Sequence, residues 1–218
     1  MNFLAFLRDH WLHVAPILLA AAFAIAIVIE RYHTLFKAYP MKDPQGFFDE
    51  IGRQVVAGRM DEALAHCEKQ GQKPVAVVVK QALLRARQPE ALIENALEIS
   101  IHEAQQSIQR RTAFLSTIAN VATLLGLFGT IAGLISSFEA VGQADPQQKS
   151  ALLAAGISTA MNATMMGLAV AIPCMVAFSF LMSQSNRVTA EVESAAVRIL
   201  DMLKQRYYRV QEEIREAS

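Results

Sequence analysis

Hydroxyl and amide side chains inside two long apolar stretches are the strongest candidates for chemistry in this sequence. They occur at Thr123, Thr130, Ser158, Thr159, Asn162 and Thr164. A hydroxyl both donates and accepts a hydrogen bond, which suits it to a hydrogen-bonded chain of polar groups. Because these groups cluster on two apolar segments, they suggest a polar seam that faces a pore or another chain.

A plainer interpretation exists for each hydroxyl taken alone. A Ser or Thr in a helix often donates to the carbonyl one turn back in the same helix. Asn162 is harder to explain in this way, because an amide in hydrocarbon needs a partner or water. Both interpretations remain open at this level.

Charged groups are absent from these apolar stretches. No Asp, Glu, Lys or Arg occurs in 11–29, 114–138 or 151–186. A proton pathway generally needs a titratable group within the membrane. This chain therefore cannot form a complete proton relay alone: either it carries no protons, or a second protein brings the carboxylate.

Signals for an enzyme, a metal site or a cofactor are missing. His10 and His13 lack a carboxylate or cysteine arrangement, and Cys67 and Cys174 are too few and too differently placed. Twenty Lys/Arg balance twenty Asp/Glu, so no net field attracts nucleic acid. We expect no enzyme, no metal, no cofactor and no nucleic-acid partner.

Three uncharged stretches set the architecture. They contain 19 residues (Trp11–Ile29), 25 (Phe114–Phe138) and 36 (Ala151–Asn186). About 20 helical residues cross a hydrocarbon layer of roughly 30 Å, and backbone in lipid must satisfy its own hydrogen bonds. The sequence predicts an all-α membrane protein with transmembrane helices at 11–30, 113–138 and 151–186, the last with extensions. A cleaved signal peptide is the rival for the first segment, but Glu30-Arg31 follows without a clear cleavage site.

Basic residues predict the orientation. Of the 20 Lys and Arg, 18 lie either between the first and second spans or after the third, and such residues favour the cytoplasmic side. We expect the N-terminus outside and the C-terminus inside. Segments 1–10 and 139–150 are then periplasmic, 31–112 is a cytoplasmic helical domain, and 187–218 is a cytoplasmic C-terminal helix.

Apolar stripes with helical spacing extend beyond the spans. One consists of Ile93, Leu97, Ile101, Ala104 and Ile108, and another of Leu203, Tyr207, Val210 and Ile214. No strong stop signal separates the first stripe from the second span, so we predict one uninterrupted helix there. We expect the C-terminal stripe to pack on the cytoplasmic bundle or on a neighbouring copy.

Small residues recur within the second and third spans. We assign Gly126, Gly129, Gly133 and Gly167 to helix packing, because small residues let helices approach closely in lipid. Pro173 removes a backbone donor and frees the carbonyl of Ala169, which predicts a kink.

Two motifs resemble a known family. The first motif is similar to the second transmembrane helix of the ExbB/TolQ/MotA proton-channel family. It is the stretch Arg111–Phe138, RTAFLSTIANVATLLGLFGTIAGLISSF, with LGLFGT as its core. GISTAMNATMMGLAVAIP (Gly156–Pro173) resembles that family's third helix, and the first span ends in a similar Ile-Glu-Arg. The resemblance covers all three spans in order and is weakest in the cytoplasmic loop. Because no large cytoplasmic torque domain is present, the chain looks closer to ExbB/TolQ than to flagellar MotA.

The resemblance implies an ion-driven energy transducer in the bacterial inner membrane. Such channel subunits form a pentamer around two copies of a single-span ExbD/TolR-like partner, whose membrane aspartate carries the proton, and a TonB/TolA-like protein is a further candidate partner. Carried over by position, Thr130 and Thr164 would line the pore. We add Ser158, Thr159 and Asn162 to this H⁺ pathway because they lie in the same polar cluster.

Two positions depart from the family pattern. Relatives usually have Glu where this chain has Thr159, and often Pro where it has Thr123. The first departure removes a titratable group from the pathway and leaves the subfamily open. The alternative function is a non-conducting membrane scaffold, and a neighbouring gene for a single-span protein with a membrane Asp would distinguish the two.

Overall fold

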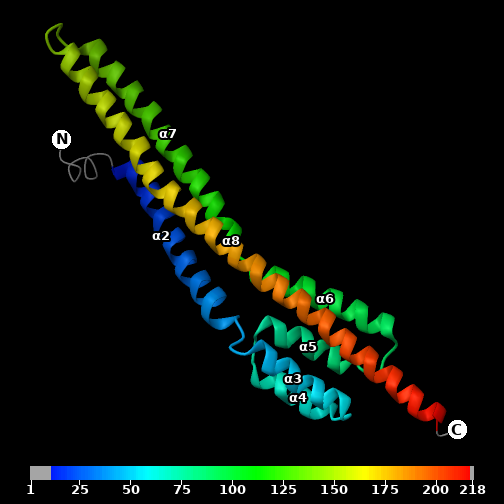
Figure 1. Ribbon diagram of the computed structural model, residues 1–218. Coiled ribbons are helices and arrows are strands. Elements are labelled where there is room, and N and C mark those ends of the chain that lie inside the picture. Colours follow the sequence, from blue (N-terminus) through cyan, green and yellow to red (C-terminus); the bar gives the residue numbers. More distant parts are fainter. Residues whose placement is uncertain (1–10, 217–218) are drawn as a thin grey trace. The chain divides into compact units, whose positions relative to one another are not determined.

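The computed structural model describes residues 11–216, and the ordered elements in this range are helices (Figure 1). Their bounds are α2 Trp11–His33, the π-helix η1 Thr34–Ala38, α3 Pro44–Val56, α4 Met60–Lys69, α5 Pro74–Leu84, α6 Glu90–Gln109, α7 Thr112–Gln143 and α8 Lys149–Glu216. The expected segment 1–10 with His10, the last residues of 187–218, and the side chains of His13 and Ile214 lie outside the described set.

Within the described part of the chain, three regions are long and apolar enough to cross a membrane: Val14–Ala38, Glu90–Gln143 and Lys149–Glu212. The second and third regions contain the predicted spans 113–138 and 151–186, and the first overlaps the predicted span 11–30 from Val14 onward, so the prediction of an all-α membrane protein is confirmed. The orientation stays a prediction.

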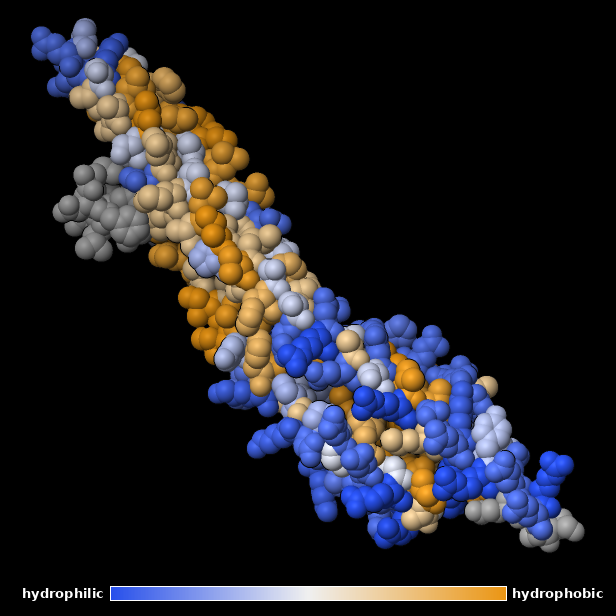
Figure 2. Space-filling model, in the orientation of Figure 1, coloured by the Kyte–Doolittle hydropathy of each residue, from blue (hydrophilic) through white to orange (hydrophobic). Residues whose placement is uncertain are grey.

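The chain divides into two compact units. We call the first the membrane unit; it contains α2 as far as Arg31 together with Arg111–Leu181. The second, the polar unit, contains Tyr32–Arg110 and the chain from Met182 onward. The face in Figure 2 is largely orange over the membrane unit and largely blue over the polar unit.

Helices α7 and α8 lie side by side and antiparallel in the membrane unit (Figure 1). Their contact face is made of small buried residues such as Ala119, Ala122 and Ala160. Large apolar side chains point outward, including Phe23 and Phe128. Small residues inside and large apolar residues outside are expected in a membrane, because burying an apolar side chain against protein instead of lipid adds little stability.

Helix α2 adds an ordinary apolar contact to this pair. Val14 and Ile17 are buried against Ala163 and Met166 of α8, with Leu125 and Val170 packed beside them. Pro16 lies inside α2, and Pro173 lies inside α8, which continues as one helix on both sides of this proline.

The predicted uninterrupted helix before the second span is wrong. Helix α6 ends at Gln109 and α7 begins at Thr112, and Arg111 between them has φ 65°. This left-handed conformation costs a non-glycine residue about 1–2 kcal/mol. The Arg111 guanidinium lies 3.1 Å from a carboxylate oxygen of Glu30 on α2, an ion pair that helps to hold the break.

The polar unit is a helical bundle with a conventional apolar core. Phe47, Ile51 and Val55 of α3 and Val78 and Val79 of α5 are buried. Asp43 caps α3 by accepting from the Gly46 N–H at 2.9 Å, and Pro44 and Pro74 begin α3 and α5, where a missing N–H is harmless. The turns after α3 and α4 contain Gly58 and Gly71, at φ 78° and 66°.

The apolar stripe of α6 faces this core. Ile93, Leu97 and Ile108 are buried, and Ile101 and Ala104 are half-buried. On α8, Val192, Ile199 and Leu203 are buried, whereas Tyr207 and Val210 are exposed. The C-terminal stripe is therefore covered only at its beginning within the described chain.

Candidate ion pathway

Thr130 of α7 and Thr164 of α8 meet across the helix contact, where their hydroxyls hydrogen-bond to each other. Thr130 Oγ1 also lies 3.1 Å from the Gly126 carbonyl oxygen of its own helix and 3.4 Å from that of Ala160 on α8. Thr164 Oγ1 reaches the same Gly126 oxygen at 3.3 Å. Two hydroxyls and two carbonyls thus form one small polar cluster between the helices.

Close backbone approach is what lets these short side chains reach across. A Cβ built on Gly129 would lie 2.7 Å from the Ala163 Cβ, and one on Gly126 would lie 3.1 Å from the Gly167 Cα. At Gly133 the nearest atoms, of Ala160, would be 3.3 Å away. Only glycine fits the tightest of these positions without movement of the neighbour. The glycines therefore set the interhelical distance that the threonine pair needs.

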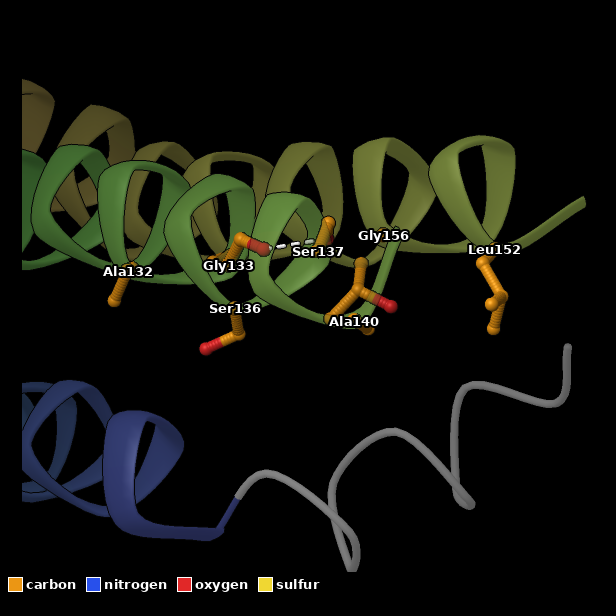
Figure 3. Close-up of a pocket in the computed structure, with 10 residues that line it drawn as sticks. Ala132, Gly133, Ser136, Ser137, Ala140, Leu152 and Gly156 are labelled. Carbon is orange, nitrogen blue, oxygen red and sulfur yellow. Dashed lines mark hydrogen bonds between the residues drawn. The ribbon is translucent and has the colours of Figure 1, made fainter. Parts of the chain in front are cut away.

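A groove of about 220 Å³ opens beside this contact, toward the loop between α7 and α8. It is lined by Gly129, Ala132, Gly133, Ser136, Ser137, Ala140, Leu152, Gly156, Thr159 and Ala163. In Figure 3 the side chains of Ser136 and Leu152 project to the same side of the helix pair. Ser137 Oγ donates to the Gly133 carbonyl at 2.6 Å, the dashed line in Figure 3. Most residues that line the groove are therefore small, and a few of them carry hydroxyl groups.

The other polar candidates behave less uniformly. Thr159 lines the groove but donates to the Ala155 carbonyl at 3.0 Å, as the plainer interpretation expects. Thr123 does the same to Ala119 at 3.0 Å. Ser158 is exposed, and Asn162 is half-buried with no side-chain hydrogen bond to the described residues. The structure thus pairs Thr130 with Thr164 and leaves the amide of Asn162 available.

Sequence reasoning missed two features here. One is Ser136 in the groove, which its position three residues after Gly133 could have indicated. The other is the ionic group at the opposite end of α2, where Glu30 contacts Arg31 at 2.9 Å and Arg111 at 3.1 Å. Glu30 directly follows the first uncharged stretch, and Arg111 lies three residues before the second. Their opposite charges at the ends of two predicted spans could have indicated this ion pair.

No cluster of three or more metal-binding side chains occurs among residues 11–216. The site therefore offers hydroxyls, carbonyls and one amide, and its apolar surroundings contain no acid or base. Such an arrangement can hydrate and orient a titratable group but cannot itself accept a proton at neutral pH.

Comparison with known proteins gives a consistent match. The model of the MotA/TolQ/ExbB proton channel family matches residues 68–194. The Tol-Pal system protein TolQ of Haemophilus influenzae is 29% identical over 202 residues, which cover 86% of this chain and 87% of that protein. A putative biopolymer transport protein ExbB homolog of Methanothermobacter thermautotrophicus is 32% identical over 76% of this chain, but the match covers 56% of that protein. The biopolymer transport protein ExbB of Pseudomonas putida is 33% identical over 48% of this chain, and the match covers 31% of that protein.

Proposed function

This chain belongs to the MotA/TolQ/ExbB proton channel family, and from that premise we propose that it is the channel subunit of an inner-membrane motor. The motor converts proton-motive force into mechanical work on the cell envelope. The subunit is a multi-pass membrane protein with its C-terminus in the cytoplasm. The transported ion is H⁺.

The observation that carries this proposal is the Thr130–Thr164 pair. Two hydroxyls from different helices meet at a glycine-lined contact, in spans whose apolar stretches contain no Asp, Glu, Lys or Arg. Hydroxyls can orient water or a carboxylic acid, but a carboxyl group must come from elsewhere to carry the proton. A partner with a membrane aspartate completes the pathway.

The partner set is what membership of this family implies. We propose a homo-oligomer, a pentamer, around two copies of a single-span ExbD/TolR-like subunit, and a TonB/TolA-like protein that receives the work. Relatives that bear the names Tol-Pal system protein and biopolymer transport protein support an envelope role. The groove beside Thr159, of about 220 Å³ and lined mostly by small residues, can receive a side chain of an approaching transmembrane helix.

Valine substitution of the paired threonines tests the proposal. Thr130→Val and Thr164→Val keep the side-chain shape but remove the hydroxyl, so we expect assembly to persist and proton-dependent work to fall to background. Thr123→Val is the matched control, because the Thr123 hydroxyl bonds only within its own helix among the described residues. The measurements are oligomer mass and proton flux in vesicles that contain this chain and its co-purified partner. Normal flux in both pathway variants would contradict a role for these hydroxyls.

A non-conducting scaffold is the second candidate, favoured by the glycine contacts, which serve assembly equally well. Purification of the tagged chain from native membranes separates the two. The channel proposal requires a co-purified single-span protein with an acidic residue in its span. If instead the chain is recovered without such a partner, or conducts ions alone, the motor proposal fails.

A further inference from the structure

A second groove, of about 750 Å³, lies on the membrane unit between α2 and α7. Its walls are apolar side chains: Leu19, Phe23 and Ile27 of α2, and Phe114 and Ile118 of α7. Leu19, Phe23 and Phe114 are each more than 60% exposed. At one end the lining changes to a carboxylate and a guanidinium, Glu30 and Arg111.

The length of this groove matches one leaflet of a bilayer. From Leu19 to Glu30 the helix advances eleven residues, which is roughly 16 Å at 1.5 Å per residue. Half of a hydrocarbon layer of roughly 30 Å is about 15 Å. The groove therefore runs from the membrane surface, at its ionic end, to about the midplane.

The ionic end has a net positive charge. Glu30 contacts two guanidinium groups, Arg31 at 2.9 Å and Arg111 at 3.1 Å. Arg31 is buried, whereas the Arg111 side chain is 48% exposed and can offer further N–H donors. Helix α7 begins at Thr112, and a helix N-terminus adds partial positive charge at this point. A phosphate group at the membrane surface fits this end of the groove.

We propose that this groove binds one anionic phospholipid of the leaflet at the Glu30 end of α2. An acyl chain lies along Leu19, Phe23 and Ile27, and the phosphate lies against the exposed part of Arg111. Under the orientation expected from the basic residues, this is the cytoplasmic leaflet, where anionic lipids gather and basic groups recognise their head groups. The exposed guanidinium of Arg111 at one end and the apolar wall of leaflet length beside it match a phosphate head group and an acyl chain, so we favour the lipid. This site is separate from the threonine pathway and does not depend on it.

Lipid retention by the full-length chain tests the proposal. The protein is placed in nanodiscs that contain equal phosphatidylglycerol and phosphatidylcholine, then released into mild detergent, and its bound lipids are counted by native mass spectrometry. We expect about one phosphatidylglycerol per subunit, retained over phosphatidylcholine. Arg111→Gln should lower this preference about fivefold, the value of one basic group near an anionic surface. Glu30→Gln should raise it, because the net charge increases.

Two further variants separate the acyl chain from the charge. Ala26→Trp fills the groove while the ionic group stays intact, so it should abolish retention without a change in oligomer mass. Arg187→Gln removes a cation outside the groove, which pairs with Glu191 at 3.4 Å, and should have no effect. Excess glycerol phosphate, which has no acyl chain, should not displace the lipid. The proposal is overturned if Ala26→Trp and Arg111→Gln retain lipid like the unaltered chain, if glycerol phosphate displaces it, or if Ala26→Trp breaks the oligomer, which would place a second copy in the groove.

Discussion

Gly167 of α8 lies so close to α7 that a Cβ built on it would come within 2.6 Å of the Ala122 carbonyl oxygen. The obstacle is backbone and cannot rotate away. The two helices would have to separate, and the Thr130–Thr164 pair three residues along α8 would separate with them.

Gly167→Ala should therefore destabilise the membrane unit. Overpacking of a tight contact costs about 1–3 kcal/mol, so we expect a lower melting temperature and a smaller yield of intact oligomer by size-exclusion chromatography. Gly142→Ala is the matched control, since no atom lies within 4 Å of a Cβ built there. It should be neutral or slightly stabilising, because alanine favours helix more than glycine does. Equal melting temperatures for the two variants would contradict the close contact.

Arg111 should tolerate glycine better than a β-branched residue. Its φ of 65° suits glycine, whereas valine pays the left-handed cost of about 1–2 kcal/mol. Both substitutions lose the contact with Glu30 equally, so the difference in unfolding free energy between Arg111→Gly and Arg111→Val isolates the backbone term.

Arg110 provides the comparison, because its φ of −50° and ψ of 134° are accessible to any residue. Arg110→Val should match or exceed Arg110→Gly in stability. If valine were equally tolerated at Arg111, the helix would run straight through this position after all.

Adjacent leucines at the end of α5 should differ sharply in their contribution to the polar unit. Leu83 is 3% exposed and Leu84 is 55% exposed. Leu83→Ala should cost about 2–5 kcal/mol through lost burial and a cavity, whereas Leu84→Ala should remain within about 0.5 kcal/mol. Denaturant unfolding of the detergent-solubilised full chain, followed by circular dichroism, measures both. A large loss at Leu84 would instead indicate that a partner covers this side chain.

Cys67 should be chemically silent in the folded protein. Burial raises the pKa of its thiol to about 12, while nearby Lys80 opposes the shift only in part. At pH 8 almost no thiolate is present, so in a Cys174→Ser background a thiol reagent should label the chain only after unfolding. Glu68→Cys, at an exposed neighbouring position, should react at once. Rapid labelling of Cys67 at pH 8 would mean that α4 is not packed as described.

The same shift fixes the sign of a pH effect. The pKa of Cys67 lies above its ordinary value of 9.0, so the folded state binds this proton more tightly than the unfolded chain. The associated stabilisation is complete below pH 9 and is lost as the pH rises toward 12. Cys67→Ala should remove this part of the alkaline destabilisation and leave stability at pH 7 independent of the thiol's charge.

The number of spans and the all-α class could be predicted from sequence. An uncharged stretch long enough to cross the hydrocarbon layer must be helical there, because its backbone has no other hydrogen-bond partners in lipid. The break at Arg111 could not. Buried positions continue with helical spacing from Ile108 through Thr112, Leu115 and Ala119, so periodicity shows one helix where there are two. The left-handed residue is an arginine, and no glycine or proline marks the interruption.

The threonine pair was only partly predictable. Motif resemblance indicated Thr130 and Thr164, and the small-residue spacing indicated only that each of their helices packs tightly against another surface. Without that motif, residue type and spacing did not distinguish Thr159, which bonds its own helix, from Thr164, which reaches across. That difference depends on the rotation of α8 against α7, a tertiary quantity.

The shared carbonyl of Gly126 has one more consequence. It lies within reach of both Thr130 and Thr164, and the Ala160 carbonyl is a second acceptor. Each hydroxyl hydrogen can turn about its C–O bond without moving a heavy atom, so either threonine can be the donor to the other. The pair has no preferred polarity of its own, so under the function proposed above the direction of proton transfer past it would be set by the membrane gradient and by the partner that brings the acid.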